Sequence, residues 1–230
     1  VEVLADTIRI ENDGAIKSDS LSGGDGGAII LTARDSFTLS NAGIEAVTRG
    51  SGAGGRILIQ APDIALSKDG LINISALSGN GNAGKLTIIG SYLTLNNSAI
   101  ATATFTEGDA GQVSLTADTI TAVNANIQGE THGAGSGANI TFLATDISLS
   151  ETIVNSSTVG AGIGGIIRFD SDTIGINDHS AIESDSLHSG DGGDIILNAR
   201  DSFSLTNARI EAETKGSGVG GFIEIQAPEI

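Results

Sequence analysis

The chain has 230 residues and a formal net charge of −17, with 28 acidic residues, 11 basic residues and no cysteine. A chain this acidic is repelled by phosphate backbones and anionic lipid, so nucleic acids and membrane surfaces are poor partners. No run approaches the roughly 20 apolar residues of a membrane-spanning helix, and no signal peptide opens the chain. Hydrophobic residues make up 39% but aromatic residues only 3%, which favours a narrow, repetitive β core.

Two nested repeats organise the sequence. Residues 5–64 return at 171–230 with a constant offset of 166. A shorter period of 27 to 29 residues fills the interval, and its glycine-rich phrase begins at Gly24, Gly52, Gly81, Gly108, Gly135, Gly162, Gly190 and Gly218. Such a period is typical of an elongated array. We therefore expect residues 1–230 to form one domain, cut from a longer polymer because Val1 and Ile230 both fall inside a unit.

Each unit contains three short runs in which apolar and polar residues alternate, and this pattern predicts three strands. In the first complete unit the inward positions are Ile29, Leu31, Ala33, Phe37, Leu39, Ile44 and Ala46. Turn residues separate the runs: Arg34–Asp35 or Pro62–Asp63 after the first run, an asparagine after the second and the glycine-rich phrase after the third.

Three short strands cannot close a core alone, but stacking pairs each strand with its counterparts in the neighbouring coils. The sequence therefore predicts an all-β protein, a parallel β-helix with three strands per coil and about eight coils of 27–29 residues, on the order of 40 Å long. One predicted inward column is Ile29, Ile57, Leu86, Val113, Ile140, Ile167, Ile195 and Ile223. The next is Leu31, Ile59, Ile88, Leu115, Phe142, Phe169, Leu197 and Ile225. A slip of one residue would turn charged neighbours inward.

Asparagine recurs before the third strand of most units, where its side chain tolerates a left-handed backbone and can hydrogen-bond to the same position in the next coil. The expected asparagine column contains Asn12, Asn41, Asn97, Asn124, Asn177 and Asn207. Threonines after the third strand are expected to face outward at Thr102, Thr104 and Thr106, without forming the regular rows of an ice-binding surface.

One outward cluster has the residue types of a catalytic site. Arg168, Asp170 and Asp172 alternate with inward residues and should share one outer face of a strand. Carboxylates beside an arginine on a β-helix face are typical of the general acid and base groups of polysaccharide lyases and hydrolases. The earlier copy has Glu2, Leu4 and Asp6 at these positions. The cluster is therefore specific to one coil, as expected of a site or of a solvated face that has drifted in sequence.

Calcium is the second candidate ligand, because carboxylates on loops bind hard cations. The candidates Asp19, Asp25, Asp185 and Asp191 lie in turns rich in glycine and serine. Reading the equivalent loop position from coil to coil never places two carboxylates next to each other, so a calcium spine is not expected and only loose calcium binding stays open. His132, His179 and His188 lack metal-like spacing, and no cofactor is expected.

The unit pattern resembles a known class of repeat. Units such as GDGGAIILTARDSFTLSNAGIEAVTRGSGAGGRILIQAPDI and GNAGKLTIIGSYLTLNNSAIATATFTEGDAG are similar to those of filamentous-haemagglutinin-type large exoproteins, including those of cyanobacteria. The resemblance covers the whole chain. It implies a right-handed β-helical fibre that is exported by two-partner secretion and displayed as an adhesin or surface filament.

These observations lead to the expectation of an extracellular structural or adhesive fibre without catalysis, extended by self-association end to end or by continuation in a longer chain. Two alternatives remain open. One is a secreted polysaccharide lyase or hydrolase that uses the surface carboxylates. The other is an adhesin that binds a carbohydrate or cell-surface ligand through a part of the protein outside this segment.

Overall fold

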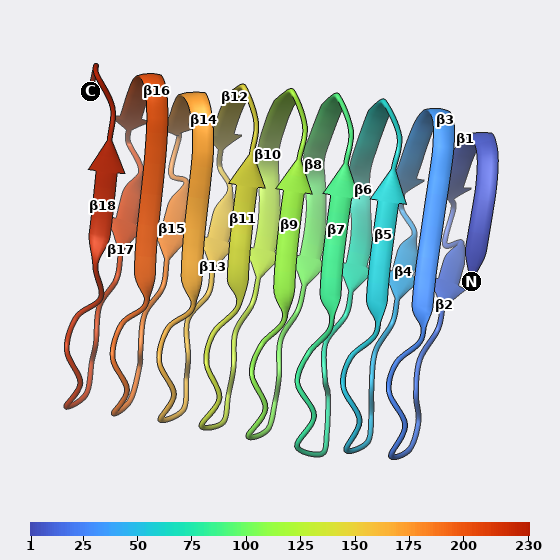
Figure 1. Cartoon of the computed structure of the whole chain (residues 1–230), viewed down its shortest axis with the longest axis horizontal. Helices are drawn as coiled ribbons and strands as arrows, with labels where there is room; N and C mark the ends of the chain where they lie inside the picture. Colours follow the sequence, from blue (N-terminus) through green and yellow to red (C-terminus); the bar gives the residue numbers. More distant parts are fainter.

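The chain winds into a stack of parallel β coils, with its two termini at opposite ends of the stack (Figure 1). The computed structural model describes residues 1–230 and contains eighteen strands in one sheet, and no helix of membrane-spanning length and hydropathy occurs in it. In chain order the strands are β1 (Glu2–Glu11), β2 (Ala15–Lys17), β3 (Ala28–Ser40), β4 (Gly43–Glu45), β5 (Arg56–Gln60), β6 (Asp63–Asn73), β7 (Lys85–Ile89), β8 (Tyr92–Ala101), β9 (Gln112–Thr116), β10 (Thr119–Gln128), β11 (Asn139–Leu143), β12 (Asp146–Ser150), β13 (Ile153–Asn155), β14 (Ile166–Asn177), β15 (Ala181–Glu183), β16 (Asp194–Thr206), β17 (Arg209–Glu211) and β18 (Ile223–Gln226).

Every complete coil contains the three predicted β segments, counted from coil 1 at β1 and β2. In coil 6 the segments are the separate strands β11, β12 and β13, whereas elsewhere one strand often continues through a corner, as β14 does in coil 7. Eight coils are complete, and β18 begins the next. The prediction of an all-β parallel β-helix with three strands per coil is confirmed.

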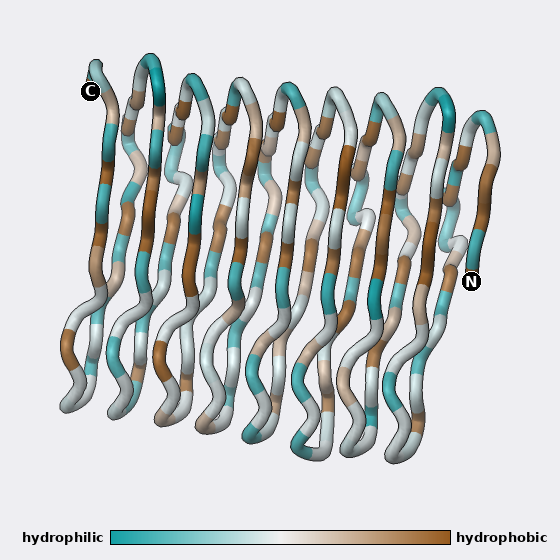
Figure 2. Tube along the Cα trace, viewed as in Figure 1, coloured by the Kyte–Doolittle hydropathy of each residue, from teal (hydrophilic) through white to brown (hydrophobic).

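The coils pair column by column in the predicted register. Ile29 is opposite Ile57, Ile57 is opposite Leu86, and the column continues through β18. In the next column the rings of Phe142 and Phe169 lie 4.3 Å apart between centroids. The columns build one core of 47 buried hydrophobic residues, and Figure 2 shows the matching alternation of hydrophobic and hydrophilic residues along the strands.

The coils differ in length by one or two residues, and the extra residues all lie in corners and loops, outside the core columns. The corner after the first segment gains a residue at Arg34–Asp35 and at Arg200–Asp201, where the pairing register shifts. The corner before the third segment gains one where two successive residues have positive φ, as at Lys68–Asp69 and Asp178–His179. The loop after β6 gains one at Gly79, with φ of 78°. The register of the core survives each insertion.

The asparagine column forms only in part. Asn124 donates a hydrogen bond from Nδ2 to Oδ1 of Asn97, and Asn97 donates likewise to Asp69, both at 3.1 Å. Asn97 and Asn124 have the expected positive φ. Asn177 does not, because it is the last residue of β14 and pairs with Thr206, so that Asp178 occupies the left-handed corner position of its coil. The asparagine column is thus interrupted at Lys68, Glu151 and Asp178, which take the left-handed corner position in coils 3, 6 and 7.

The expectation that Thr102 and Thr104 face outward is wrong, because both side chains are fully buried. They belong to inward columns near the loops, where serine and threonine replace the aliphatic residues of the strands. The Thr104 hydroxyl lies 2.8 Å from that of Thr131 and donates to the carbonyl oxygen of Gly108 at 2.7 Å. The interior is therefore aliphatic between the strands and lined by hydroxyl groups toward the loops.

Candidate functional site

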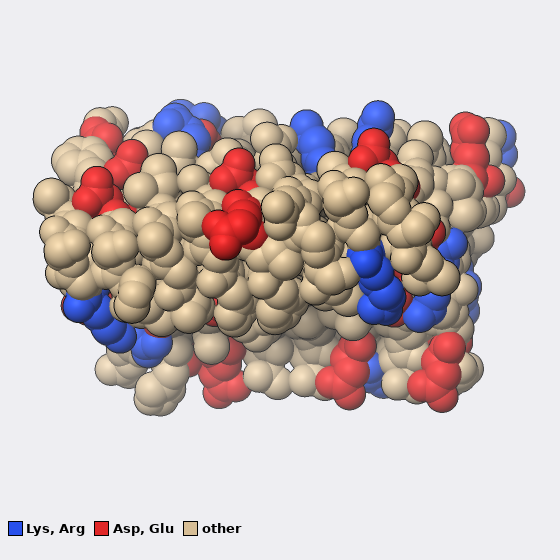
Figure 3. All heavy atoms as spheres, turned by 90° about the horizontal axis from the view of Figure 1, so that it is seen from below, with Lys and Arg blue, Asp and Glu red and all other residues tan.

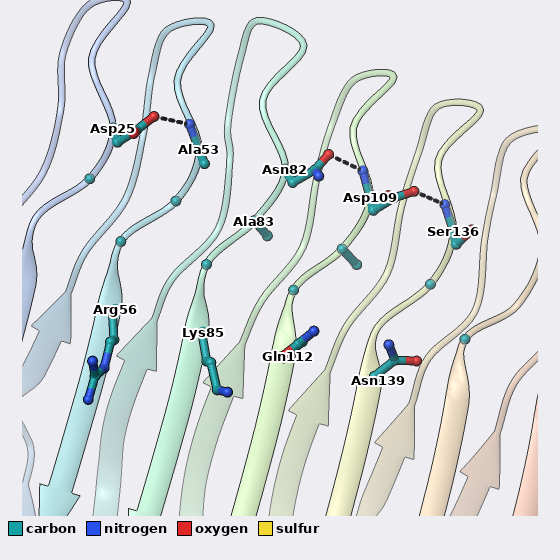
Figure 4. Close-up of a pocket in the computed structure, with 18 of the residues that line it drawn as sticks. Asp25, Ala53, Arg56, Asn82, Ala83, Lys85, Asp109, Gln112, Ser136 and Asn139 are labelled. Atoms are coloured by element: carbon teal, nitrogen blue, oxygen red, sulfur yellow. Dashed lines mark hydrogen bonds between the residues drawn. The ribbon is translucent and has the colours of Figure 1, made fainter.

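A groove of about 690 Å³ runs along the rod where the chain leaves each glycine-rich loop and enters the first segment of the next coil (Figure 4). It extends from the turn before β3 to the turn before β14 and so crosses six consecutive coils. With neighbouring coils about 4.8 Å apart, the groove is about 24 Å long. Its shape suits a linear molecule that lies parallel to the rod axis.

Glycine forms the floor of this groove because a side chain there would collide with the preceding coil. A Cβ atom on Gly55 would lie 2.2 Å from the carbonyl oxygen of Gly27, and one on Gly84 would lie 2.0 Å from that of Gly55. Gly111 is equally constrained by the carbonyl oxygen of Gly84, at 2.0 Å. Close stacking therefore requires the glycines, and their missing side chains leave the surface hollow.

One wall of the groove is a row of polar residues at the beginnings of consecutive first segments. Arg56 begins β5, Lys85 begins β7, Gln112 begins β9 and Asn139 begins β11 (Figure 4). They are successive register partners, one coil apart. All four side chains are exposed, and none takes part in the ion pairs of the chain. These side chains are free to bind a ligand.

The opposite wall is formed by loop residues that link one coil to the next. Asp25 accepts a hydrogen bond at Oδ1 from the main-chain N–H of Ala53 at 2.8 Å, and Asp109 accepts one from Ser136 at 2.8 Å. Asn82 does the same through its amide oxygen, from the N–H of Asp109 at 2.9 Å (Figure 4). Each of these side chains uses Oδ1 for this bond, so its second polar atom, Oδ2 of the aspartates or Nδ2 of Asn82, stays available to a ligand in the groove.

The same link accounts for all four candidate calcium ligands. Each carboxylate accepts a hydrogen bond from a main-chain N–H one coil further on, at 2.7 to 2.9 Å, in the residues Asp19, Asp25, Asp185 and Asp191. No group of three or more His, Cys, Asp or Glu side chains is arranged to hold a metal ion. Their acceptor role explains why aspartate recurs in these turns.

The candidate catalytic cluster is an ion-pair network. Arg168 and Asp170 lie on the outer face of β14 as expected and form a bidentate pair, with Nε–Oδ2 at 2.6 Å and Nη2–Oδ1 at 3.0 Å. Asn198, in the next coil, donates to Oδ1 of Asp170 at 2.8 Å. Partial burial alone would raise the pKa of Asp170, but hydrogen bonds from Arg168 and Asn198 and the charges of Arg168 and Arg200 outweigh it, so the pKa is lowered.

Asp172 pairs with a different partner, the guanidinium of Arg200 in the next coil. The earlier copy of the long repeat has the equivalent pair, in which Asp6 accepts from Arg34 at 2.7 Å. Asp172 and Arg200 are thus one of two copies of a structural pair. Only the pairing of Arg168 with Asp170 is peculiar to coil 7.

The loop tips carry an outer row with no acidic residue, one residue per coil. Phe105 and His132 stack in this row with ring centroids 4.7 Å apart, and Val159 and Leu187 follow, each partly exposed. Figure 3, which views the loop end of the rod, shows a broad band of uncharged surface along it, with most charged residues toward its margins. Beside Leu187 lies a second, smaller pocket of about 300 Å³.

No family model, curated protein or solved structure matches this chain. Function is therefore inferred from the geometry of the surface. The sequence interpretation missed Asn198 and Arg200, and it missed the groove wall of Arg56 and Lys85. Both sets become visible in the sequence only when outward positions are compared one period apart, in the same way as the inward columns.

Proposed function

We propose that this chain is part of an extracellular structural or adhesive filament in which the rod itself is the working part. The observation that carries the proposal is the unbroken stacking of the core: apolar columns pass through every coil, while outward residues differ between coils paired in register. Such an array can be lengthened by adding coils under the same packing rule. The resemblance to filamentous-haemagglutinin-type exoproteins, which implies two-partner secretion and surface display, supports this function.

The filament grows either by further coils of the same polypeptide or by end-to-end contact between copies. In both arrangements a new coil pairs with an edge strand and covers the apolar cross-section of the coil beneath it. The parallel register between neighbouring coils provides the template for such pairing.

The pKa of Asp170 and the ion pair of Asp172 also support a purely structural function. General acid catalysis near neutral pH needs a carboxyl group whose pKa is raised. Asp170 has the opposite shift, because Arg168 and Asn198 stabilise its charged form more than partial burial disfavours it. Asp172 is occupied by Arg200. These contacts support ion pairing over polysaccharide cleavage at this cluster.

Immunogold electron microscopy of native cells tests the filament proposal. Antibodies raised against the purified chain should label thin fibres outside the cell, at intervals along their length. Cells in which the gene is deleted provide the control and should lose both the label and the fibres. Label confined to the cell interior, or spread over compact particles, would contradict the proposal.

A further inference from the structure

We propose that the groove beside the first segments binds a linear polysaccharide whose sugars carry carboxylate groups, with the sugar chain parallel to the rod axis. This site lies within the coils themselves and does not depend on the filament proposal. It differs from an adhesin whose specificity lies outside this segment. The groove crosses six coils, about 24 Å at about 4.8 Å per coil, and so accommodates a run of about five sugar rings.

The positive end of the groove indicates the charge of the ligand. Arg56 and Lys85 are direct register partners in adjacent coils, and like charges placed opposite each other on a sheet destabilise it. By contrast, Lys17, Arg34, Arg168, Arg200 and Arg209 all form ion pairs with carboxylates of the chain. A carboxylate bound between Arg56 and Lys85 would relieve their repulsion and form charge-assisted hydrogen bonds with both.

The sheet face next to this pair bears no acidic residue in coils 2 to 6. The outward positions of the first segments there are Ala28, Ile30, Thr32, Arg56, Leu58, Gln60, Lys85, Thr87, Ile89, Gln112, Ser114, Thr116, Asn139, Thr141 and Leu143. This composition is unusual in a chain with 28 acidic residues. The more distant acidic residues are screened at physiological salt, where the Debye length is about 8 Å. The two acidic residues of the groove itself, Asp25 and Asp109, belong to the opposite wall, so a carboxylate would bind along the wall of Arg56 and Lys85.

Beyond the positive pair, the groove offers partners for sugar hydroxyl groups. The amides of Gln112 and Asn139 continue the same wall at one-coil intervals and can both donate and accept. Across the groove, Asp25 and Asp109 each use Oδ1 to bind the next coil and leave their other oxygen available as an acceptor. The wall of the first segments can therefore bind both the carboxylates and the hydroxyl groups of a sugar chain. The loop wall can accept hydrogen bonds from its hydroxyl groups.

The groove fits a polysaccharide better than a peptide or a nucleic acid. A peptide that adds to a sheet needs unpaired main-chain groups, but those on the floor are already used, as when Gly84 donates to Ile74 at 2.8 Å and Lys85 donates to Gly55 at 3.0 Å. A nucleic acid needs many basic contacts, and the groove provides only Arg56 and Lys85. A sugar polymer can be held by side chains alone.

Binding of hexagalacturonate to the full chain, measured by calorimetry and compared with the neutral cellohexaose, tests the proposal. The double variant Arg56→Gln/Lys85→Gln should lose about tenfold or more in affinity for hexagalacturonate. The control Arg49→Gln/Lys68→Gln changes the net charge equally, at exposed and unpaired basic residues outside the groove, and should change affinity less than about twofold.

A second variant, Gln112→Ala/Asn139→Ala, separates groove contacts from general electrostatics, because it leaves the net charge unchanged and should still weaken binding severalfold. Unchanged thermal unfolding would show that each variant is folded, as expected for exposed side chains. No binding of hexagalacturonate by the wild-type chain would overturn the proposal. Equal losses in the two charge variants, or equal affinity for cellohexaose, would overturn it as well.

Discussion

Short polar side chains in the loops of this protein act as main-chain acceptors for the next coil. Asp25, Asn82 and Asp191 occupy the same loop position in different coils, and each accepts a hydrogen bond from the N–H group one coil further on. Asparagine and aspartate both serve because each has an oxygen at the required distance. The loops, which have no apolar core of their own, are held to each other in this way.

The first prediction follows from this equivalence. Asp25→Ala removes the acceptor of the Ala53 N–H in an exposed hydrogen bond, where water can take its place, and should lower the free energy of unfolding by about 0.5 to 1.5 kcal/mol. Asp25→Asn keeps an acceptor, as Asn82 does naturally, and should be nearly neutral. Urea unfolding of the two variants measures the difference. A chelator should leave the melting temperature unchanged; a clear decrease, and a large loss in Asp25→Asn, would instead indicate bound calcium.

Asp170 gives a second prediction, on pH. Its pKa is lower in the folded chain than in the unfolded chain, so its ion pair stabilises the fold at pH above about 4, and this contribution is lost as the pH falls through the folded pKa. Asp170→Asn should lose about 1 kcal/mol at pH 7 and less at pH 3, where the carboxyl group is mostly protonated in the unfolded chain. Unfolding by urea at both pH values measures this, with the exposed Asp63→Asn as control. An equal loss at both pH values would rule out the ion pair as the cause.

At the scale of the element, the stacking distance is enforced by glycine where loop and first segment meet. The third prediction compares two Gly→Ala changes. A Cβ on Gly84 would meet the carbonyl oxygen of Gly55 at 2.0 Å, whereas one on Gly43 has no atom nearer than 3.9 Å. Gly84→Ala should destabilise by about 3 kcal/mol and Gly43→Ala by much less. Chemical unfolding of both variants tests this, and similar losses would show that stacking does not depend on the glycine floor.

The strands were predictable because inward residues repeat in two ways, within a strand and between coils. Ile29 and Ile57, for example, belong to an alternating run and also to a column. Thr104 also repeats between coils, in a column of serine, threonine and alanine. Its hydroxyl group, however, favours the surface when a sequence is judged by hydropathy alone, so the inward position was missed. The hydrogen bond that Asp25 accepts was not predictable, because its partner is a main-chain N–H, which leaves no trace in the sequence.

The groove was not predictable from any single unit. Its floor is recorded in the sequence as turn glycines, and its wall combines one outward residue from each of several coils. Arg56 and Lys85 are 29 positions apart, the longest step of the short period. Their pairing in register therefore depends on the extra residues of coil 3, which are placed correctly only once the corner at Lys68–Asp69 and the loop at Gly79 are known.

For the whole molecule, the fourth prediction concerns modularity. Deleting residues 85–111 removes one coil and joins Gly84 to Gln112, which then takes the register position of Lys85. The shortened chain should fold and unfold cooperatively. Its free energy of unfolding should fall by the contribution of one coil and one interface between coils. Deleting residues 85–97 removes only part of a coil, misaligns the columns and should prevent folding. Circular dichroism and thermal unfolding distinguish these outcomes; two equally folded products would contradict strict column registry.

The direction of the main-chain hydrogen bonds also sets how the rod responds to tension. Each coil is bound to the next by bonds parallel to the rod axis, so a pull on the two ends of the chain peels off one coil at a time. A released coil of about 27 residues lengthens the chain by about 90 Å. Force spectroscopy should show a series of peaks at that spacing, and one single large extension would contradict it. A tether built this way lengthens stepwise under load and dissipates energy at each step.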